Sequence, residues 1–143
     1  MKNYTSEVPA FRTVARIEEC LVRAGATNIM KDYSNGQLDG LCFSIGIEGK
    51  TFGIRVPANI AAVEKVLASE IKRPTRERLG RLKAQAERTA WKLMQDWVEV
   101  QLSLVEMRQA ELLQVFLPYV WNGKTTIYLA FKNGGYLLPE YKP

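Results

Sequence analysis

The chain has 143 residues, of which 47% are hydrophobic and 24% charged, so it is long enough for one domain with a substantial core and ordinary in composition for a globular protein. Twenty Lys and Arg residues against fifteen Asp and Glu residues give a net charge of +5. No apolar run reaches the roughly 18 residues of a membrane span, and the first residues lack the apolar core of a signal peptide, so we expect a cytoplasmic protein.

The chain contains no histidine, which removes the commonest general base, the commonest metal ligand and the usual catalytic triads. Its two cysteines, Cys20 and Cys42, lack metal-ligand spacing, and we expect both to be reduced and buried. Gly46, Gly49 and Gly53 fall within an expected hairpin, so they do not form a phosphate-binding loop between a strand and a helix. This content favours a protein that is not an enzyme and needs neither a metal nor a cofactor.

The first 70 residues show the pattern of a helix, three antiparallel strands and a second helix. The expected helices cover residues 13–24 and 60–70, and the expected strands cover residues 28–33, 41–47 and 52–56. Apolar residues recur at helical spacing in the helices and alternate with small or polar residues in the second and third strands. Asn35-Gly36 and Glu48-Gly49-Lys50 supply the turns, and Asn59 caps the second helix. We therefore predict an α+β fold whose core is an α-β-β-β-α unit.

Residues 75–121 are expected to form a helical extension dominated by one long helix. Pro74-Thr75 starts this helix, which runs to about Arg108. Its apolar residues recur at intervals of three and four and define a heptad-like seam. The seam consists of Leu79, Leu82, Ala86, Ala90, Leu93, Trp97, Val100, Leu104 and Met107. A further helix is expected over residues 110–121, broken near Pro118.

The C-terminal segment, residues 122–143, is expected to be a hairpin or an extended tail of the same single domain. Asn122-Gly123 has the sequence of a turn. Residues 125–131 fit either a strand or a short helix. The apolar Leu137-Leu138-Pro139 fits an extended segment that packs on the body.

Positive charge is concentrated at the start of the long helix. Residues 71–92 hold eight Lys and Arg against two Glu, a local charge of +6, so the rest of the chain sums to −1. Because cations near a helix N-terminus oppose the helix macrodipole, an anionic partner explains this pattern better than helix stability does. The candidate partner-binding residues are Arg73, Arg76, Arg78, Arg81, Lys83, Arg88, Trp91 and Lys92. We expect Trp91 to be partly exposed beside this surface and Trp97, on the seam, to be buried.

Four explanations of the cationic surface stay open. It is an ordinary solvated helix face, a surface for nucleic-acid phosphates, or a surface for an acidic protein. The fourth explanation is a homodimer through the long helix. Past Lys92 the outer face becomes acidic at Asp96, Glu99, Glu106 and Glu111, so two antiparallel copies would set a basic half against an acidic half.

Four segments carry a resemblance to a known family. They are residues 24–33 (AGATNIMKDY), 52–59 (FGIRVPAN), 85–102 (QAERTAWKLMQDWVEVQL) and 115–119 (VFLPY). On these segments the chain resembles a family of small uncharacterised proteins of bacteriophages, prophages and other bacterial mobile elements. The resemblance implies a phage-type protein that acts in the bacterial host cytoplasm on DNA, RNA or a host defence system, and it transfers no catalytic residues.

Two functional hypotheses follow from the cationic surface and this context. The first is a non-enzymatic nucleic-acid-binding protein that uses the basic helix face without reading sequence. The second is an anti-CRISPR-like protein that inhibits a bacterial defence complex by occupying its surface. Both need a surface and no active site.

Overall fold

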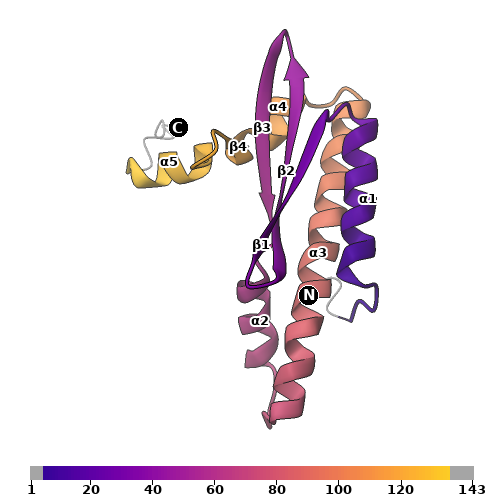
Figure 1. Ribbon diagram of the computed structural model, residues 1–143, viewed down its shortest axis with the longest axis vertical. Helices are drawn as coiled ribbons and strands as arrows, with labels where there is room; N and C mark the ends of the chain where they lie inside the picture. The colour runs from indigo at the N-terminus through magenta and orange to yellow at the C-terminus, as the bar shows by residue number, and fades with distance from the viewer. Residues whose placement is uncertain (1–4, 136–143) are drawn as a thin grey trace, which may run out of the picture.

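An antiparallel sheet of four strands forms one layer of an α+β fold, and helices pack on its apolar face (Figure 1). The structure is a computed structural model that describes residues 5–135. The strands are β1 (Asn28–Ser34), β2 (Gln37–Ile47), β3 (Lys50–Pro57) and β4 (Val120–Trp121), in that order across the sheet. The three predicted strands are confirmed. The sequence does not predict β4, because a strand of two residues is too short to show alternation.

Two tight turns set the register of the first three strands. Asn35 and Gly36 adopt φ angles of 52° and 77°, and Glu48 and Gly49 adopt 50° and 79°, which is the backbone that these turn sequences favour. The core-facing residues of β2 and β3 are Leu41, Phe43, Ile45, Ile54 and Val56, each at most 5% exposed. The alternation seen in the sequence therefore describes the buried face of the sheet correctly.

Helices α1 (Ala10–Arg23) and α2 (Ile60–Ser69) both pack against α3 (Arg76–Glu106). In Figure 1, α1 runs beside the upper part of α3 and α2 beside its lower part. An ion pair between Lys31 Nζ and Glu18 Oε1, 2.8 Å apart, links β1 to α1, and hydrogen bonding to Glu18 raises the pKa of Lys31.

The middle of α3 is covered on several sides, and this corrects two expectations about tryptophan. Trp91 is fully buried, at 0% exposure, and its indole N–H donates to the Leu38 carbonyl oxygen of β2 at 3.1 Å. Trp97 is half-buried and makes edge contacts with the rings of Phe116 and Tyr119. The predictions that Trp91 is partly exposed and that Trp97 is buried are therefore wrong. Trp91 lies on a second apolar line of α3, away from the seam, and the sheet packs over it, whereas Trp97 on the seam lies at the edge of the core.

After α3 the chain returns to the sheet through short elements. These are α4 (Leu112–Phe116), the 3-10 helix η1 (Leu117–Tyr119), β4, and then α5 (Ile127–Asn133). Phe116 is fully buried against Phe43 of β2, and this contact fixes the return. Of the helix expected over residues 110–121, residues 112–119 are helical, as α4 and η1. Residues 120–121 form strand β4 instead.

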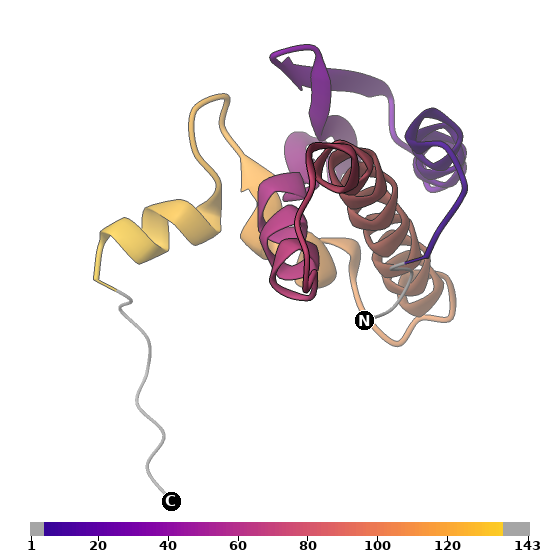
Figure 2. The same cartoon turned by 90° about the horizontal axis from the view of Figure 1, so that it is seen from below.

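Helix α5 stands away from the rest of the molecule in both cartoon views (Figures 1 and 2). It settles the choice between strand and helix for residues 125–131 in favour of a helix, capped by Thr126. The expected extended segment at Leu137-Leu138-Pro139 lies outside the described residues. Within residues 5–135, none of the helices is both long and apolar enough to cross a membrane.

Candidate functional site

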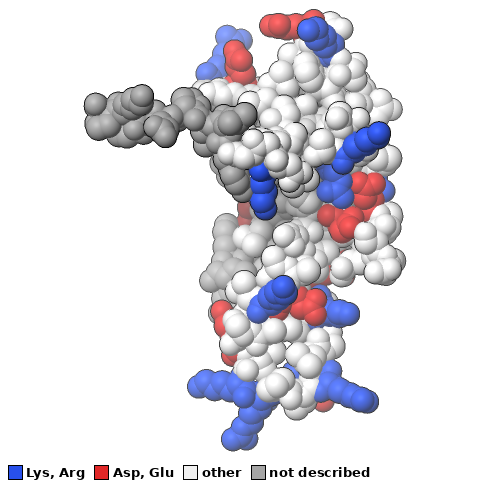
Figure 3. All heavy atoms as spheres, turned by 90° about the vertical axis from the view of Figure 1, so that its left-hand side faces the viewer, with Lys and Arg blue, Asp and Glu red and all other residues white. Residues whose placement is uncertain are grey.

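Cationic side chains gather where α2 turns into α3, at the lower end of the molecule (Figure 3). We call this surface the basic end. It consists of Lys65, Lys72, Arg73, Arg76, Arg78, Arg81 and Lys83, all of which are exposed. Over residues 64–83 these seven cations face three acids, Glu64, Glu70 and Glu77, which leaves a net charge of +4. Figure 3 shows several of the blue side chains at this end pointing outward in different directions.

The start of α3 adds its own positive potential to the basic end. Thr75 caps the helix, and its Oγ1 accepts from the backbone N–H of Arg78 at 3.2 Å. The Arg78 guanidinium donates back to the Arg73 carbonyl oxygen at 3.1 Å, which holds the turn and its cations together. Because the first N–H groups of a helix carry a partial positive charge, the helix and its side chains attract the same kind of partner.

A groove of about 740 Å³ runs along one side of the basic end. Four cationic residues line it, with one acid, Glu70, at its edge; the cations are Lys72, Arg78, Arg81 and Arg88. Ile71 and Leu82 form part of its apolar lining. This groove is open to solvent, and its cationic residues favour an anionic partner.

Arg81 pairs with Glu77, whose Oε1 lies 2.6 Å from Nη2. The two side chains are 71% and 78% exposed, so solvent screens the pair strongly. A phosphate competes well for Arg81 under these conditions. Arg81 therefore remains part of the candidate surface.

Arg88 is tied into the body of the protein. It is half-buried, and its Nε donates to the Ser6 carbonyl oxygen at 3.1 Å while Nη2 donates to Gln85 Oε1 at 2.7 Å. Gln85 donates to the same Ser6 carbonyl oxygen, also at 3.1 Å. Arg88 thus anchors the segment before α1 onto α3 as well as lining the groove.

Lys92 and Trp91 are further from the predicted surface. The Lys92 ammonium is half-buried, donates to Gln95 Oε1 at 3.2 Å and lies 4.0 Å from Asp96 Oδ1. Trp91 is buried under the sheet, so it cannot contact a partner. The eight predicted residues therefore divide into five exposed cations, two cations engaged within the chain and one core tryptophan.

Two cations that the prediction left out of the site, Lys65 and Lys72, belong to the basic end. Lys65 lies on α2 and Lys72 in the connection to α3, and both are exposed. The sequence signal for these two lysines is the short connection between α2 and α3. A short connection makes two helices pack as antiparallel neighbours, which brings Lys65 and Lys72 beside the start of α3.

A second polar cluster lies on the outer face of the sheet. Arg55 Nε donates to Asp32 Oδ2 at 3.1 Å, and Arg55 Nη2 lies 3.8 Å from Asp39 Oδ1. Burial, with the nearby Asp32 carboxylate, raises the pKa of the Cys42 thiol to about 11. One cation, Arg55, lies between two carboxylates, and a group of His, Cys, Asp and Glu side chains suited to a metal is absent from the described part of the chain. Its arrangement is that of a structural ion pair.

No protein-family model, curated protein or solved structure matches this chain. The candidate site is therefore defined by the geometry and charge of its own residues.

Proposed function

We propose that the protein is a non-enzymatic nucleic-acid-binding protein that contacts the phosphate backbone through the basic end. The observation that carries the proposal is the exposure of Arg73, Arg76, Arg78, Arg81 and Lys83 around the start of a capped helix of 31 residues. Each such cation neutralises a phosphate and releases a counterion, which is the main source of sequence-independent affinity for nucleic acid.

The chemistry of the basic end favours backbone contacts over base recognition. Base stacking needs exposed aromatic rings, and Trp91, the aromatic residue of the predicted surface, is in the core. The exposed side chains of the basic end are Lys and Arg, which neutralise phosphates at any sequence. We therefore propose binding that does not distinguish one sequence from another.

From the resemblance to proteins of phages and mobile elements, we propose that this binding occurs in a bacterial host cytoplasm. A competing proposal is that the same surface binds an acidic protein of a host defence system. Exposed cations serve either partner, but the helix N-terminus and the open groove suit a chain of phosphates best. We therefore give priority to nucleic acid and treat an acidic protein as an outcome of the test.

The test compares two variants of equal charge. The first carries Arg76→Ala, Arg78→Ala, Arg81→Ala and Lys83→Ala at the basic end. The control carries Arg12→Ala, Arg16→Ala, Lys50→Ala and Lys124→Ala, which remove four exposed cations from other surfaces. Binding to single- and double-stranded oligonucleotides is measured by fluorescence anisotropy over a range of salt concentrations.

The variant of the basic end should lose affinity for all sequences alike, and its plot of log affinity against log salt should become shallower by about three to four units on duplex DNA. The control should keep most of the wild-type slope. Equal slopes for the two variants would overturn the proposal, because net charge alone would then explain binding.

A further inference from the structure

Helix α5 is a short apolar helix that contacts the rest of the described chain at η1 and leaves most of its apolar side chains exposed. None of its seven residues is buried, and Ile127, Tyr128 and Leu129 are 43%, 47% and 45% exposed. Helices of fewer than about 12 residues are marginal in water unless an apolar face packs against something. The side chains of Ile127, Tyr128 and Leu129 thus offer an apolar surface that residues 5–135 of the same chain leave largely exposed.

The base of α5 is nevertheless held firmly. Asn122 Oδ1 accepts from the backbone N–H groups of Lys124 and Thr125 at 2.9 and 3.0 Å, and Thr126 Oγ1 caps the helix by accepting from the Leu129 N–H. Trp121 pairs with Gly53 of β3 on one side and with Thr126 on the other. The turn therefore fixes the direction in which α5 leaves the sheet, and we call residues 122–135 the arm.

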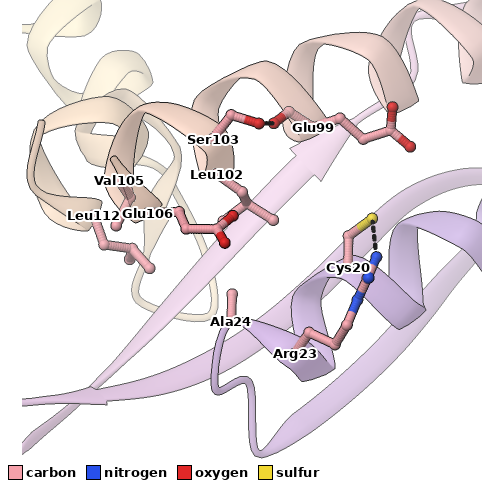
Figure 4. A pocket seen from close by; sticks show the side chains of 9 residues that line it. All are labelled: Cys20, Arg23, Ala24, Glu99, Leu102, Ser103, Val105, Glu106 and Leu112. Carbon is pink, nitrogen blue, oxygen red and sulfur yellow. Dashed lines mark hydrogen bonds between the residues drawn. The ribbon is translucent and has the colours of Figure 1, made fainter. Parts of the chain in front are cut away.

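A groove of matching character lies between the C-terminal ends of α1 and α3 (Figure 4). It has a volume of about 620 Å³, and Leu102, Val105 and Leu112 form its apolar lining. Glu99 and Glu106 of α3 line one side, while Cys20 and Arg23 of α1 lie opposite them (Figure 4). We call this the acidic groove.

The acidic groove continues into an apolar patch at the end of α3. A shallow hollow of about 500 Å³ shares Glu99 with the groove and adds Asp96 and the apolar Val100 and Met107. Val100 and Met107 are 57% and 70% exposed. The surface therefore combines exposed apolar side chains with two acids, Glu99 and Glu106, against one cation, Arg23, while Asp96 beside them pairs with Lys92.

The charge of the arm is complementary to this surface. Residues 122–135 contain Lys124 and Lys132 and no acid, a charge of +2 beside the apolar side chains of α5. A basic, apolar helix and an acidic, apolar groove fit the helix-in-groove mode of recognition. Figures 1 and 2 both place α5 and α1 on opposite sides of the molecule, so the groove of the same chain is out of reach of the arm.

We propose that the arm of one copy of the chain docks in the acidic groove of a second copy. Each copy carries one arm and one groove, so two copies satisfy each other in a closed dimer by reciprocal exchange. This dimer differs from the antiparallel pairing of whole long helices, because α1 and the sheet cover the middle of α3. It does not rest on nucleic-acid binding, since the basic end lies at the opposite end of α3 (Figure 1).

The first test is the oligomeric state of the full chain by sedimentation velocity at high micromolar concentration. We expect a dimer, and we expect Leu129→Glu to weaken its dissociation constant by at least about tenfold, because it puts a carboxylate into an apolar, acidic groove. The matched control is Phe11→Glu, which places the same charge on another exposed apolar residue, 71% exposed, at the other end of α1. A monomeric wild type, or equal effects of the two variants, would overturn the proposal.

The second test uses Cys20, which lines the acidic groove. In a chain with Ala130→Cys on the arm, mild oxidation should link position 130 of one copy to Cys20 of the other and give a covalent dimer on a non-reducing gel. Cys42 does not interfere, because it is 5% exposed and its raised pKa keeps it protonated at neutral pH. Adding Cys20→Ser should abolish the link, and the placement control Ala61→Cys on α2 should give none. A covalent dimer that survives Cys20→Ser would contradict this docking.

The third test asks whether the charges meet as proposed. Lys132→Glu and Glu106→Lys should each weaken the dimer by about two- to fivefold at low salt, the range expected of exposed charges. The double variant should recover most of the loss. Additive weakening in the double variant would show that the arm and the acidic groove do not face each other.

Discussion

The start of α3 and the middle of α3 differ in what their cations do. Arg76, Arg78 and Arg81 are exposed at the basic end, whereas Arg88 and Lys92, only a few turns further along the same helix, are half-buried and bonded within the chain. The difference arises from the neighbours of the helix, because α1 and the segment before it pack beside the middle of α3 and stop short of its start. A regular stripe of charge on one helix therefore divides into a surface and an internal anchor.

The core of α3 and its exposed start should differ most strongly in the free energy of unfolding that a truncation costs. Trp91→Ala should lower the free energy of unfolding by about 3–5 kcal/mol, because it empties a fully buried aromatic site and leaves the Leu38 carbonyl without its donor. Leu79→Ala, at a residue 44% exposed near the start of α3, should cost under about 1 kcal/mol. Urea denaturation measures both changes.

If Trp91→Ala does not fold, Trp91→Phe gives the same comparison with most of the apolar volume kept. It should still cost more than Leu79→Ala. Equal costs at the two positions would mean that the middle of α3 is not the core of the fold.

The second effect compares the two tryptophans of α3. Trp97→Ala should cost about 2–3 kcal/mol, less than Trp91→Ala, because Trp97 is half-buried and its ring contacts are with Phe116 and Tyr119 at the edge of the core. The measurement is again equilibrium unfolding in urea. A larger loss at Trp97 than at Trp91 would restore the order that the sequence predicts.

Much of the fold follows from local patterns in the sequence. The two turns at Asn35-Gly36 and Glu48-Gly49, the alternation in β2 and the caps at Asn59 and Thr75 are signals within a few residues of the structure they produce. Strand β4 has no such signal, since it pairs with β3 only because the buried Phe116 brings the chain back to the sheet.

The candidate site shows the same division between local and distant causes. Exposure from Arg73 to Lys83 follows from a polar segment at the end of a helical hairpin, and the sequence predicts it. The hydrogen bond that holds Arg88 is made to the Ser6 carbonyl, 82 residues away, and no local sequence pattern predicts that contact. The burial of Trp91 likewise depends on the Leu38 carbonyl of a strand that the spacing within α3 does not reveal.

The third comparison is between two arginines of α3, Arg88 in the internal anchor and Arg81 at the basic end, which should differ in their contribution to stability. Arg88→Ala should lower the free energy of unfolding by about 1–2 kcal/mol, since Ser6 and Gln85 lose a charged donor. Arg81→Ala should change it by less than about 0.5 kcal/mol, because its ion pair with Glu77 is exposed. Thermal and urea unfolding of the two variants measure both changes in the free energy of unfolding. A larger cost at Arg81 would reverse the assignment of anchor and surface.

The smallest change in stability is expected where the cations of the basic end oppose the macrodipole of α3. Arg76 is the first residue of α3, where a cation opposes the macrodipole. Arg76→Glu should therefore raise the stability by about 0.3–1 kcal/mol at low salt, and the gain should shrink as salt is added. Urea unfolding at two salt concentrations shows whether it does. A loss of stability at low salt would indicate that Arg76 has a structural role.

Amide chemical shifts locate directly the surface on which nucleic acid binds. In a titration of the isotope-labelled chain with a short oligonucleotide, followed by amide chemical shifts, we expect the changes to cluster over residues 65–85. The amides of the sheet and of α5 should stay close to their positions in the unbound protein. Shifts centred on the sheet or on α5, with residues 65–85 unchanged, would contradict the assignment of the basic end as the binding surface.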